Sequence, residues 1–273
     1  MPRVEDDPIR TIEISEPDLE FEGLRFLTVY SPSLKARGDI TVHVPPALTA
    51  SASAPIVLLL HGVYGSHWAW FLKGAAHRTS SQLLAAGRIR PMLLASSSDG
   101  LFQDGSGYLA HSGHDFETWI TTDVIGALRR SFPFIDENSS IFIAGLSMGG
   151  YGALRLGAKH ATMFQGISAH SAITDIAEMA SFVFDPFPIG EIADRQDEIL
   201  YWIEKNRKHL PAIRFDCGIA DPLLEGNRRF HYALLQRQVH HQYVEFTGAH
   251  EWSYWRTHLA DSLLFFEGLL SGR

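Results

Sequence analysis

The sequence predicts an α/β protein: one mostly parallel central sheet, helices on both of its faces, and an antiparallel edge formed by the N-terminal strands. Short apolar runs rich in valine, isoleucine and leucine alternate with longer stretches of helical period, as in a sheet that is covered by helices. The chain has 273 residues, of which 45% are hydrophobic and 20% charged, the composition of a globular protein with a substantial core. We therefore expect a single domain over residues 1–273.

The first two strands are expected to pair as a hairpin at one edge of the sheet. Residues 24–30 and 39–44 are strand-like, and the turn-rich stretch SPSLKARG separates them. Pro45 and Pro46 then end the second strand, because proline has no N–H to donate to a neighbouring strand. This hairpin accounts for the predicted antiparallel edge.

The rest of the chain alternates between candidate parallel strands and helices. Strands are expected at residues 56–60, 92–95, 141–144, 166–170, 212–215 and 242–246. Helices are expected at residues 66–86, 115–130, 148–159, 223–238 and 252–270. Residues 175–210 interrupt the alternation, and we expect them to form an insertion over the strand ends, and so over the active site, with a charged helix at about 197–205.

A G-x-S-x-G motif, Gly145-Leu146-Ser147-Met148-Gly149, lies between a predicted strand and a predicted helix. Small residues on both sides of the serine permit a strained turn that lifts its hydroxyl above the sheet. The strand IFIA runs directly into the motif and the helical stretch GGYGALRLGAKH runs out of it, which is the context that the motif requires. We therefore predict Ser147 as a catalytic nucleophile; the alternative is a tight glycine turn with an idle serine.

A nucleophilic serine needs a histidine to take its proton, and His250 is the best-placed candidate. It ends the sequence FTGAH, in a loop directly after the last predicted strand. Four other histidines in this part of the chain either precede that strand or lie in predicted helices: His231, His240, His241 and His258. The alternative for His250 is a surface or capping role.

The carboxylate that orients the histidine is predicted to be Asp221. This residue lies in CGIADPLL, beyond the strand AIRF and before a helix, where the loops of such sheets gather their active sites. Asp216 is the rival, because it adjoins the strand and its direction depends on the pleat. Asp221 precedes Pro222 and Leu223 and could also cap the helix, alone or in addition to a catalytic role.

Two backbone N–H groups must stabilise the oxyanion that forms when a serine attacks an ester. One comes from the residue after the nucleophile, here Met148, and the other from the loop after an earlier strand. The loop HGVYG follows the strand IVLLL, and Val63 is its preferred donor. The alternative is a plain strand-to-helix turn.

Five segments together resemble the esterase D branch of the α/β-hydrolases: LLHGVYGSHWAW, SSSDGLFQDGSGY, GLSMGGYGAL, CGIADPLL and GAHEWSYW. This branch includes tributyrin-type esterases, feruloyl esterases, S-formylglutathione hydrolases and mycolyltransferases. The resemblance runs from about residue 24 to the last helix, with the motifs in the family's order. It implies the α/β-hydrolase fold, with Ser147, Asp221 and His250 as catalytic residues and the amides of Val63 and Met148 as oxyanion hole.

Composition argues against several other classes of protein. The chain carries 23 Lys and Arg against 31 Asp and Glu, a net charge of -8, and has no basic run for a nucleic acid backbone. Its longest run of valine, isoleucine and leucine is IVLLL, too short to span a membrane. The N-terminal sequence mixes acids and prolines instead of a secretory signal, so we expect a cytoplasmic protein without nucleic acid or membrane partners.

No metal or other cofactor is expected. Cys217 is the only cysteine, so neither a disulfide within the chain nor a thiolate zinc cluster can form. The sequence HEWSY lacks the second histidine of H-E-x-x-H, and His111 and His114 have no obvious third ligand.

Two further features lie near the proposed site in sequence. Trp68, Trp70, Trp252 and Trp255 flank its loops, and aromatic rings can line a pocket, although at least half of them are expected to pack in the core. The loop at residues 99–108, DGLFQDGSGY, is expected either to shape the pocket, to bind an ion or to form a plain turn.

The sequence therefore predicts a serine carboxylic-ester hydrolase that acts through an acyl-enzyme on small or medium acyl or aryl esters. Its partner is a small-molecule ester, and the oligomeric state stays open, a homo-oligomer included. Two alternatives remain: an acyltransferase of the same fold, and a non-catalytic binding protein that kept the fold.

Overall fold

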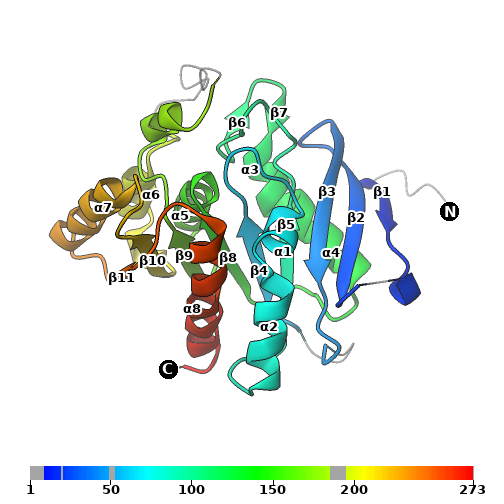
Figure 1. Cartoon of the computed structure of the whole chain (residues 1–273). Helices are drawn as coiled ribbons and strands as arrows, with labels where there is room; N and C mark the ends of the chain where they lie inside the picture. The colour runs from blue at the N-terminus through cyan, green and yellow to red at the C-terminus, as the bar shows by residue number, and fades with distance from the viewer. Residues whose placement is uncertain (1–8, 20, 49–52, 185–194, 273) are drawn as a thin grey trace.

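The computed structural model describes residues 9–19, 21–48, 53–184 and 195–272, which form one nine-stranded sheet with helices packed around it (Figure 1). The strands follow the order β1-β2-β3-β5-β4-β8-β9-β10-β11 across the sheet. Their bounds are β1 Arg10–Ile14, β2 Leu24–Ser31, β3 Ala36–His43, β4 Ile56–Leu60, β5 Leu93–Ser97, β8 Ile141–Leu146, β9 Gly166–His170, β10 Ala212–Gly218 and β11 Gln242–Phe246. Two short strands, β6 Ala110–His111 and β7 His114–Asp115, pair only with each other.

The N-terminal end of the sheet is antiparallel and the remainder is parallel, which confirms the predicted fold class. β1, β2, β3 and β5 pair antiparallel in that order. β5, β4, β8, β9, β10 and β11 pair parallel. β1 is not predicted from the sequence, because RTIEI is largely polar and its pairing is irregular between Arg10 and Ile12.

Helices cover both faces of the sheet, and successive residues of the central strand β4 divide between the two cores. Ile56, Leu58 and Leu60 belong to the core that includes the apolar side chains of α4 and α5. Val57 and Leu59 belong to the core that includes those of α2 and α8. The helices are α1 Ala69–Leu72, α2 Ala76–Ala85, α3 Phe116–Thr118, α4 Ile125–Ser131, α5 Met148–Lys159, α6 Ile199–Lys205, α7 Leu224–Gln236 and α8 Trp252–Leu270. The two-sided burial explains why the parallel strands are continuous apolar runs.

Two of the predicted helices are interrupted in the structure. The helix expected at residues 66–86 is divided into α1 and α2, because Ala75 adopts a left-handed conformation with φ 53°. At Gly74 a β-carbon would lie 2.5 Å from the Trp70 carbonyl oxygen, so the chain there requires glycine. The helix expected at residues 115–130 begins as α3, passes through a π-helical segment at Trp119–Val124 and ends as α4.

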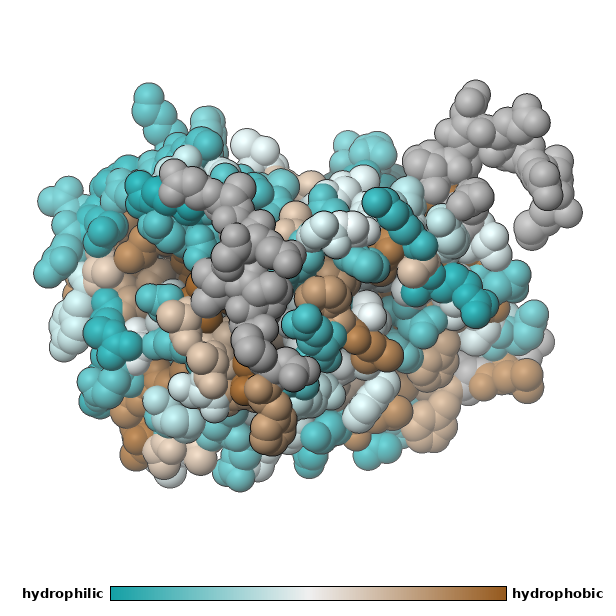
Figure 2. All heavy atoms as spheres, turned by 90° about the horizontal axis from the view of Figure 1, so that it is seen from above, coloured by the Kyte–Doolittle hydropathy of each residue, from teal (hydrophilic) through white to brown (hydrophobic). Residues whose placement is uncertain are grey.

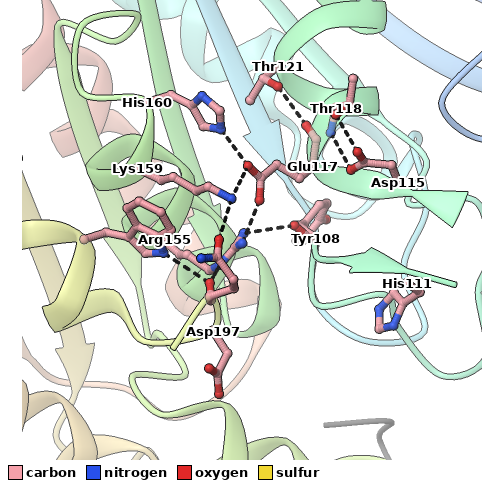
Figure 3. Close-up of polar contacts among 12 residues, drawn as sticks. Tyr108, His111, Asp115, Glu117, Thr118, Thr121, Arg155, Lys159, His160 and Asp197 are labelled. Carbon is pink, nitrogen blue, oxygen red and sulfur yellow. Dashed lines mark hydrogen bonds and ion pairs between the residues drawn. The ribbon is translucent and has the colours of Figure 1, made fainter. Parts of the chain in front are cut away.

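An insertion is expected at residues 175–210, of which the stretch 185–194 lies outside the described residues. The described residues of this segment form a 3-10 helix at Ile176–Ser181 and the helix α6, which packs against α5. Arg155 and Lys159 of α5 donate hydrogen bonds to Gln196, where the described chain returns. The same two cations bind the Glu117 carboxylate at 2.6 and 2.7 Å (Figure 3). An ionic cluster therefore fixes this segment to the helix that follows Ser147.

Candidate active site

Ser147 lies in a strained turn between β8 and α5. Its backbone has φ 53° and ψ −119°, a conformation that costs energy for any residue with a β-carbon. The motif's glycines permit this turn, because a β-carbon would lie 2.0 Å from the Gly149 carbonyl oxygen at Gly145, and 2.1 Å from the Leu60 carbonyl oxygen at Gly149. The sequence therefore folds locally so that the Ser147 hydroxyl stands at the N-terminus of α5, above the sheet.

Asp221 and His250 reach Ser147 from the loops after the last two strands, β10 and β11. Nε2 of His250, in the loop between β11 and α8, lies 3.0 Å from Oγ of Ser147. Nδ1 of His250 lies 2.9 and 3.1 Å from the two carboxylate oxygens of Asp221, in the loop between β10 and α7. Asp221 Oδ1 also accepts the backbone N–H of Leu223 at 2.8 Å, so this carboxylate stabilises its own turn as well. The structure thus brings together the three side chains that the sequence singled out.

Asp216, the rival carboxylate, belongs to a second Ser-His-Asp set that is completely buried. His170 Nδ1 lies 2.9 Å from Asp216, and His170 Nε2 lies 2.8 Å from Oγ of Ser262. All three residues are 0% exposed. The atom pattern repeats that of Ser147, but a substrate cannot reach it. No motif in the sequence marks His170, which precedes the acid in the chain and is the last residue of β9.

A cavity of about 330 Å³ opens beside Ser147 and His250. Figure 2 looks onto the face that lies uppermost in Figure 1, where brown apolar side chains come to the surface among teal polar ones. The cavity wall consists mainly of aromatic and small residues: Gly62, Val63, Tyr64, Gly65, Trp68, Ala69, Lys73, Leu146, Ser147, Phe182, His250, Trp252 and Trp255. Trp70, by contrast, is buried in the core, where its Nε1 donates to the Leu60 carbonyl. Of the described residues that are expected to form the insertion, Phe182 borders the cavity, and its ring centroid lies 5.2 Å from that of His250.

The two amides that the sequence proposes for the oxyanion have no hydrogen-bond acceptor within the described part of the chain. Met148 is the first residue of α5, and the first N–H groups of a helix lack intrahelical partners. Around Val63, by contrast, the neighbouring amides are occupied: Tyr64 N–H donates to Asp104 and Gly65 N–H to Gly62. Val63 also lines the cavity.

The loop at residues 99–108 braces the HGVYG loop and the start of α5. Asp104 accepts the Tyr64 amide at 2.9 Å, and a β-carbon at Gly105 would lie 2.4 Å from Sδ of Met148. Tyr108 donates its hydroxyl to the carbonyl of His61 at 2.9 Å. Of the three roles that the sequence left open, these contacts favour that of shaping the pocket.

His61 is a structural residue that sequence reasoning missed. It is 1% exposed, its Nδ1 lies 2.8 Å from the Gly62 carbonyl, and its Nε2 accepts the Asp99 amide at 3.3 Å. It therefore holds in place the loop that carries Val63.

Within the described residues, no group of histidine, cysteine and acidic side chains is arranged to hold a metal ion. A search of the same part of the chain finds no helix long and apolar enough to span a membrane.

Comparisons with known proteins show which family this chain belongs to. The model of the Esterase family matches residues 31–266. The chain belongs to this family. An acetyl esterase from Caldicellulosiruptor saccharolyticus is 25% identical over 256 residues, which cover 88% of this chain and 90% of the relative. The solved structure of a ferulic acid esterase superposes with a TM-score of 0.81 at 26% identity, covering 90% of this chain and 97% of the other.

A more distant structure shows the same fold. An S-formylglutathione hydrolase from Agrobacterium tumefaciens, 20% identical, has a TM-score of 0.75 and covers 97% of this chain and 100% of its own. These matches confirm the predicted esterase D-like branch of the α/β-hydrolases. The chain is a serine carboxylic-ester hydrolase.

Proposed function

We propose that this esterase cleaves small or medium acyl or aryl esters through an acyl-enzyme on Ser147. His250 takes the proton of the Ser147 hydroxyl as the oxygen attacks the ester carbonyl, and then gives this proton to the departing alcohol. Asp221 holds the imidazole in orientation and stabilises its protonated form. Water, activated by the same histidine, then releases the acid. The observation that carries this proposal is the continuous hydrogen-bonded set from Asp221 through His250 to Ser147 beside an open cavity.

The amides of Val63 and Met148 are proposed to bind the oxyanion. Both lack a protein acceptor among the described residues, and backbone donors need no reorganisation when the charge develops. Each such donor stabilises the transition state by roughly 3 kcal/mol. The size and aromatic lining of the cavity support an acyl or aryl group of moderate size.

Ser147→Ala tests the proposal against a matched control, Ser262→Ala, which removes the serine of the buried set. We expect Ser147→Ala to fold normally and to lose nearly all hydrolysis of para-nitrophenyl acetate, and Ser262→Ala to keep it. A fluorophosphonate probe should label Ser147 in the wild type and in Ser262→Ala. An active Ser147→Ala protein, or an adduct mapped to another serine, would refute the assignment. A series of para-nitrophenyl esters of increasing acyl length then defines the acyl preference.

Acyl transfer to an alcohol would use the same acyl-enzyme as hydrolysis. Product analysis with added methanol distinguishes the two reactions, and we expect the free acid to dominate at low alcohol concentration.

Two expectations from the sequence also remain proposals: that residues 1–273 form one domain, and that the protein works in the cytoplasm. A single cooperative unfolding transition and cell fractionation test them.

A further inference from the structure

A chain of aromatic contacts leads from His250 to a lysine at the edge of the cavity. The ring of Trp255 meets that of His250 at a centroid distance of 4.9 Å, and Trp252 meets Trp255 at 5.3 Å, both edge to face. Nζ of Lys73 lies 5.4 Å from the centroid of the Trp252 ring. His250, Trp255, Trp252 and Lys73 all line the same cavity as Ser147.

The positive charge of Lys73 is not neutralised by a described carboxylate. No acidic side chain in the described ranges forms an ion pair with it, and Glu251, next to His250 in sequence, pairs with neither Lys73 nor Arg256 there. Arg256 adds a second cation at this edge, since its guanidinium donates to the Lys73 carbonyl at 2.9 Å. Lys159 shows the contrast: it lies over the Trp202 ring and also binds Glu117 at 2.7 Å.

The backbone of Lys73 is held in place beside the cavity. Its N–H donates to the Ala69 carbonyl, and its carbonyl accepts from Arg256. The next residue, Gly74, packs against Trp70, and α2 begins after Ala75. In a protein of net charge -8, such a cation at the rim of an aromatic cavity favours an anionic ligand.

We propose that Lys73 makes this esterase selective for esters whose leaving group is an arene that carries a negative charge. This inference rests on the proposed function, in which His250 protonates the departing oxygen. The departing group therefore lies on the His250 side of Ser147, where the Trp255 and Trp252 rings can pack against an arene. An acidic substituent at the far end of that arene then meets the Lys73 ammonium.

The test compares two acetate esters that give the same acetyl-enzyme. The para-acetoxybenzoate ion has a charged leaving group, and para-acetoxybenzamide has a neutral one of similar shape. The measured quantity is the ratio of kcat/KM for the charged ester to that for the neutral ester, because kcat/KM reflects binding and acylation, the steps in which the leaving group takes part. In each variant this ratio is divided by that of the wild type, which cancels the difference in intrinsic reactivity.

We expect Lys73→Met to lower this ratio about fivefold, the size of a partly exposed ion pair, and Lys73→Arg to keep it. Raising the salt concentration to about 1 M, where the Debye length is about 3 Å, should lower the ratio more in the wild type than in Lys73→Met, which keeps only the Arg256 charge at this edge. Lys205→Met is the matched control, because Lys205 also lies over a tryptophan, with Nζ 4.7 Å from the Trp202 ring, but on α6 and away from the cavity. It should leave the ratio unchanged.

An unchanged ratio in Lys73→Met would overturn the inference, provided that the wild type hydrolyses both acetates and Ser147→Ala hydrolyses neither. If instead Ser147→Ala is as active as the wild type, the proposed function itself fails. Monomethyl terephthalate and its neutral amide analogue place the charge on the acyl side. A Lys73 effect confined to that second pair of esters would overturn the assignment of the charge to the leaving group.

Discussion

Asp216 and Asp221 stand five positions apart in sequence, and their surroundings give them different tasks. Asp216 is enclosed in the core, where it binds His170, Arg214 and Tyr254 at 2.9, 2.5 and 2.8 Å. Burial alone would raise the pKa of Asp216, but these three partners outweigh it and lower the pKa to about 2. Asp216 is therefore a charged structural residue, whereas Asp221 faces the imidazole beside the cavity.

The first prediction separates these two carboxylates by kcat and melting temperature. Asp221→Asn should lower kcat by up to about 10⁴-fold with little effect on melting temperature, because an amide cannot hold the imidazole in its reactive tautomer. Asp216→Asn should lower kcat much less but destabilise the protein by about 3 kcal/mol, because the buried Arg214 charge loses its nearer carboxylate and keeps only Asp261, at 3.6 Å. If the Asp216→Asn protein were stable but had a strongly lowered kcat, while Asp221→Asn stayed active, the two roles would be reversed.

At the scale of residues, local patterns in the sequence predict Ser147 and the two loop residues of its hydrogen-bonded set. They do not predict the buried residues that bind Asp216. Ser147 is marked by a motif between a strand and a helix, and His250 and Asp221 by loops after strands. The preference for Asp221 over Asp216 depends on the pleat of β10, which the sequence does not reveal. The hydrogen bond between His170 and Ser262 joins two residues that are 92 positions apart in sequence, so no local pattern could predict it.

Among the elements, the loop at residues 99–108 packs against both residues whose amides are the proposed oxyanion donors. At Gly105 a β-carbon would lie 2.4 Å from Sδ of Met148 and 3.4 Å from Cγ1 of Val63. The absence of a side chain at Gly105 therefore sets how closely this loop approaches the two residues. Their backbone amides depend on this packing for their positions.

The second prediction is that Gly105→Ala lowers kcat more than it raises KM. The new methyl group must push the Met148 side chain aside, and a shift of either amide weakens oxyanion binding, where a lost donor costs about 10²-fold or more in kcat. Steady-state kinetics with para-nitrophenyl acetate measure this effect. Adding Gly105→Ala to a Met148→Ala protein should cost much less, because the clashing sulfur is gone. An equal loss in both backgrounds would show that the methyl group acts elsewhere.

The helices and strands with clear apolar periods could be predicted from the sequence, whereas their interruptions could not. α5, α7 and α8 lie where the sequence places them, within two residues at each end. The break between α1 and α2 requires a left-handed Ala75, although alanine favours helix, so packing overrides local propensity there. The π-helical turn inside the predicted helix at 115–130 is likewise imposed by its surroundings.

For the molecule as a whole, the ionic cluster in Figure 3 ties together segments that are distant in sequence. Glu117 follows the β6–β7 pair, and it binds Arg155, Lys159 and His160 at 2.6, 2.7 and 2.8 Å. Burial opposes ionisation of Glu117, but hydrogen bonding to His160 and the charges of Arg155 and Lys159 prevail and lower its pKa well below the ordinary value. The carboxylate is therefore ionised in the folded protein, and its charge is part of what holds α5 and the returning chain at Gln196.

The last prediction follows from this lowered pKa. A group whose pKa is lower in the folded state contributes stability that is complete above its unfolded pKa, near 4.5 for Glu117, and is lost as the pH falls toward the folded value. Glu117→Gln should therefore lower the free energy of unfolding by about 3 kcal/mol near pH 7, and the difference from wild type should shrink as the pH falls below about 4.5. Urea unfolding across this pH range measures it. Glu137→Gln, which removes an exposed partner of Arg129, is the control and should change stability by less than about 1 kcal/mol at either pH. If the Glu117→Gln and wild-type stabilities stayed parallel from neutral to acid pH, the carboxylate would not be the group that links this cluster to folding.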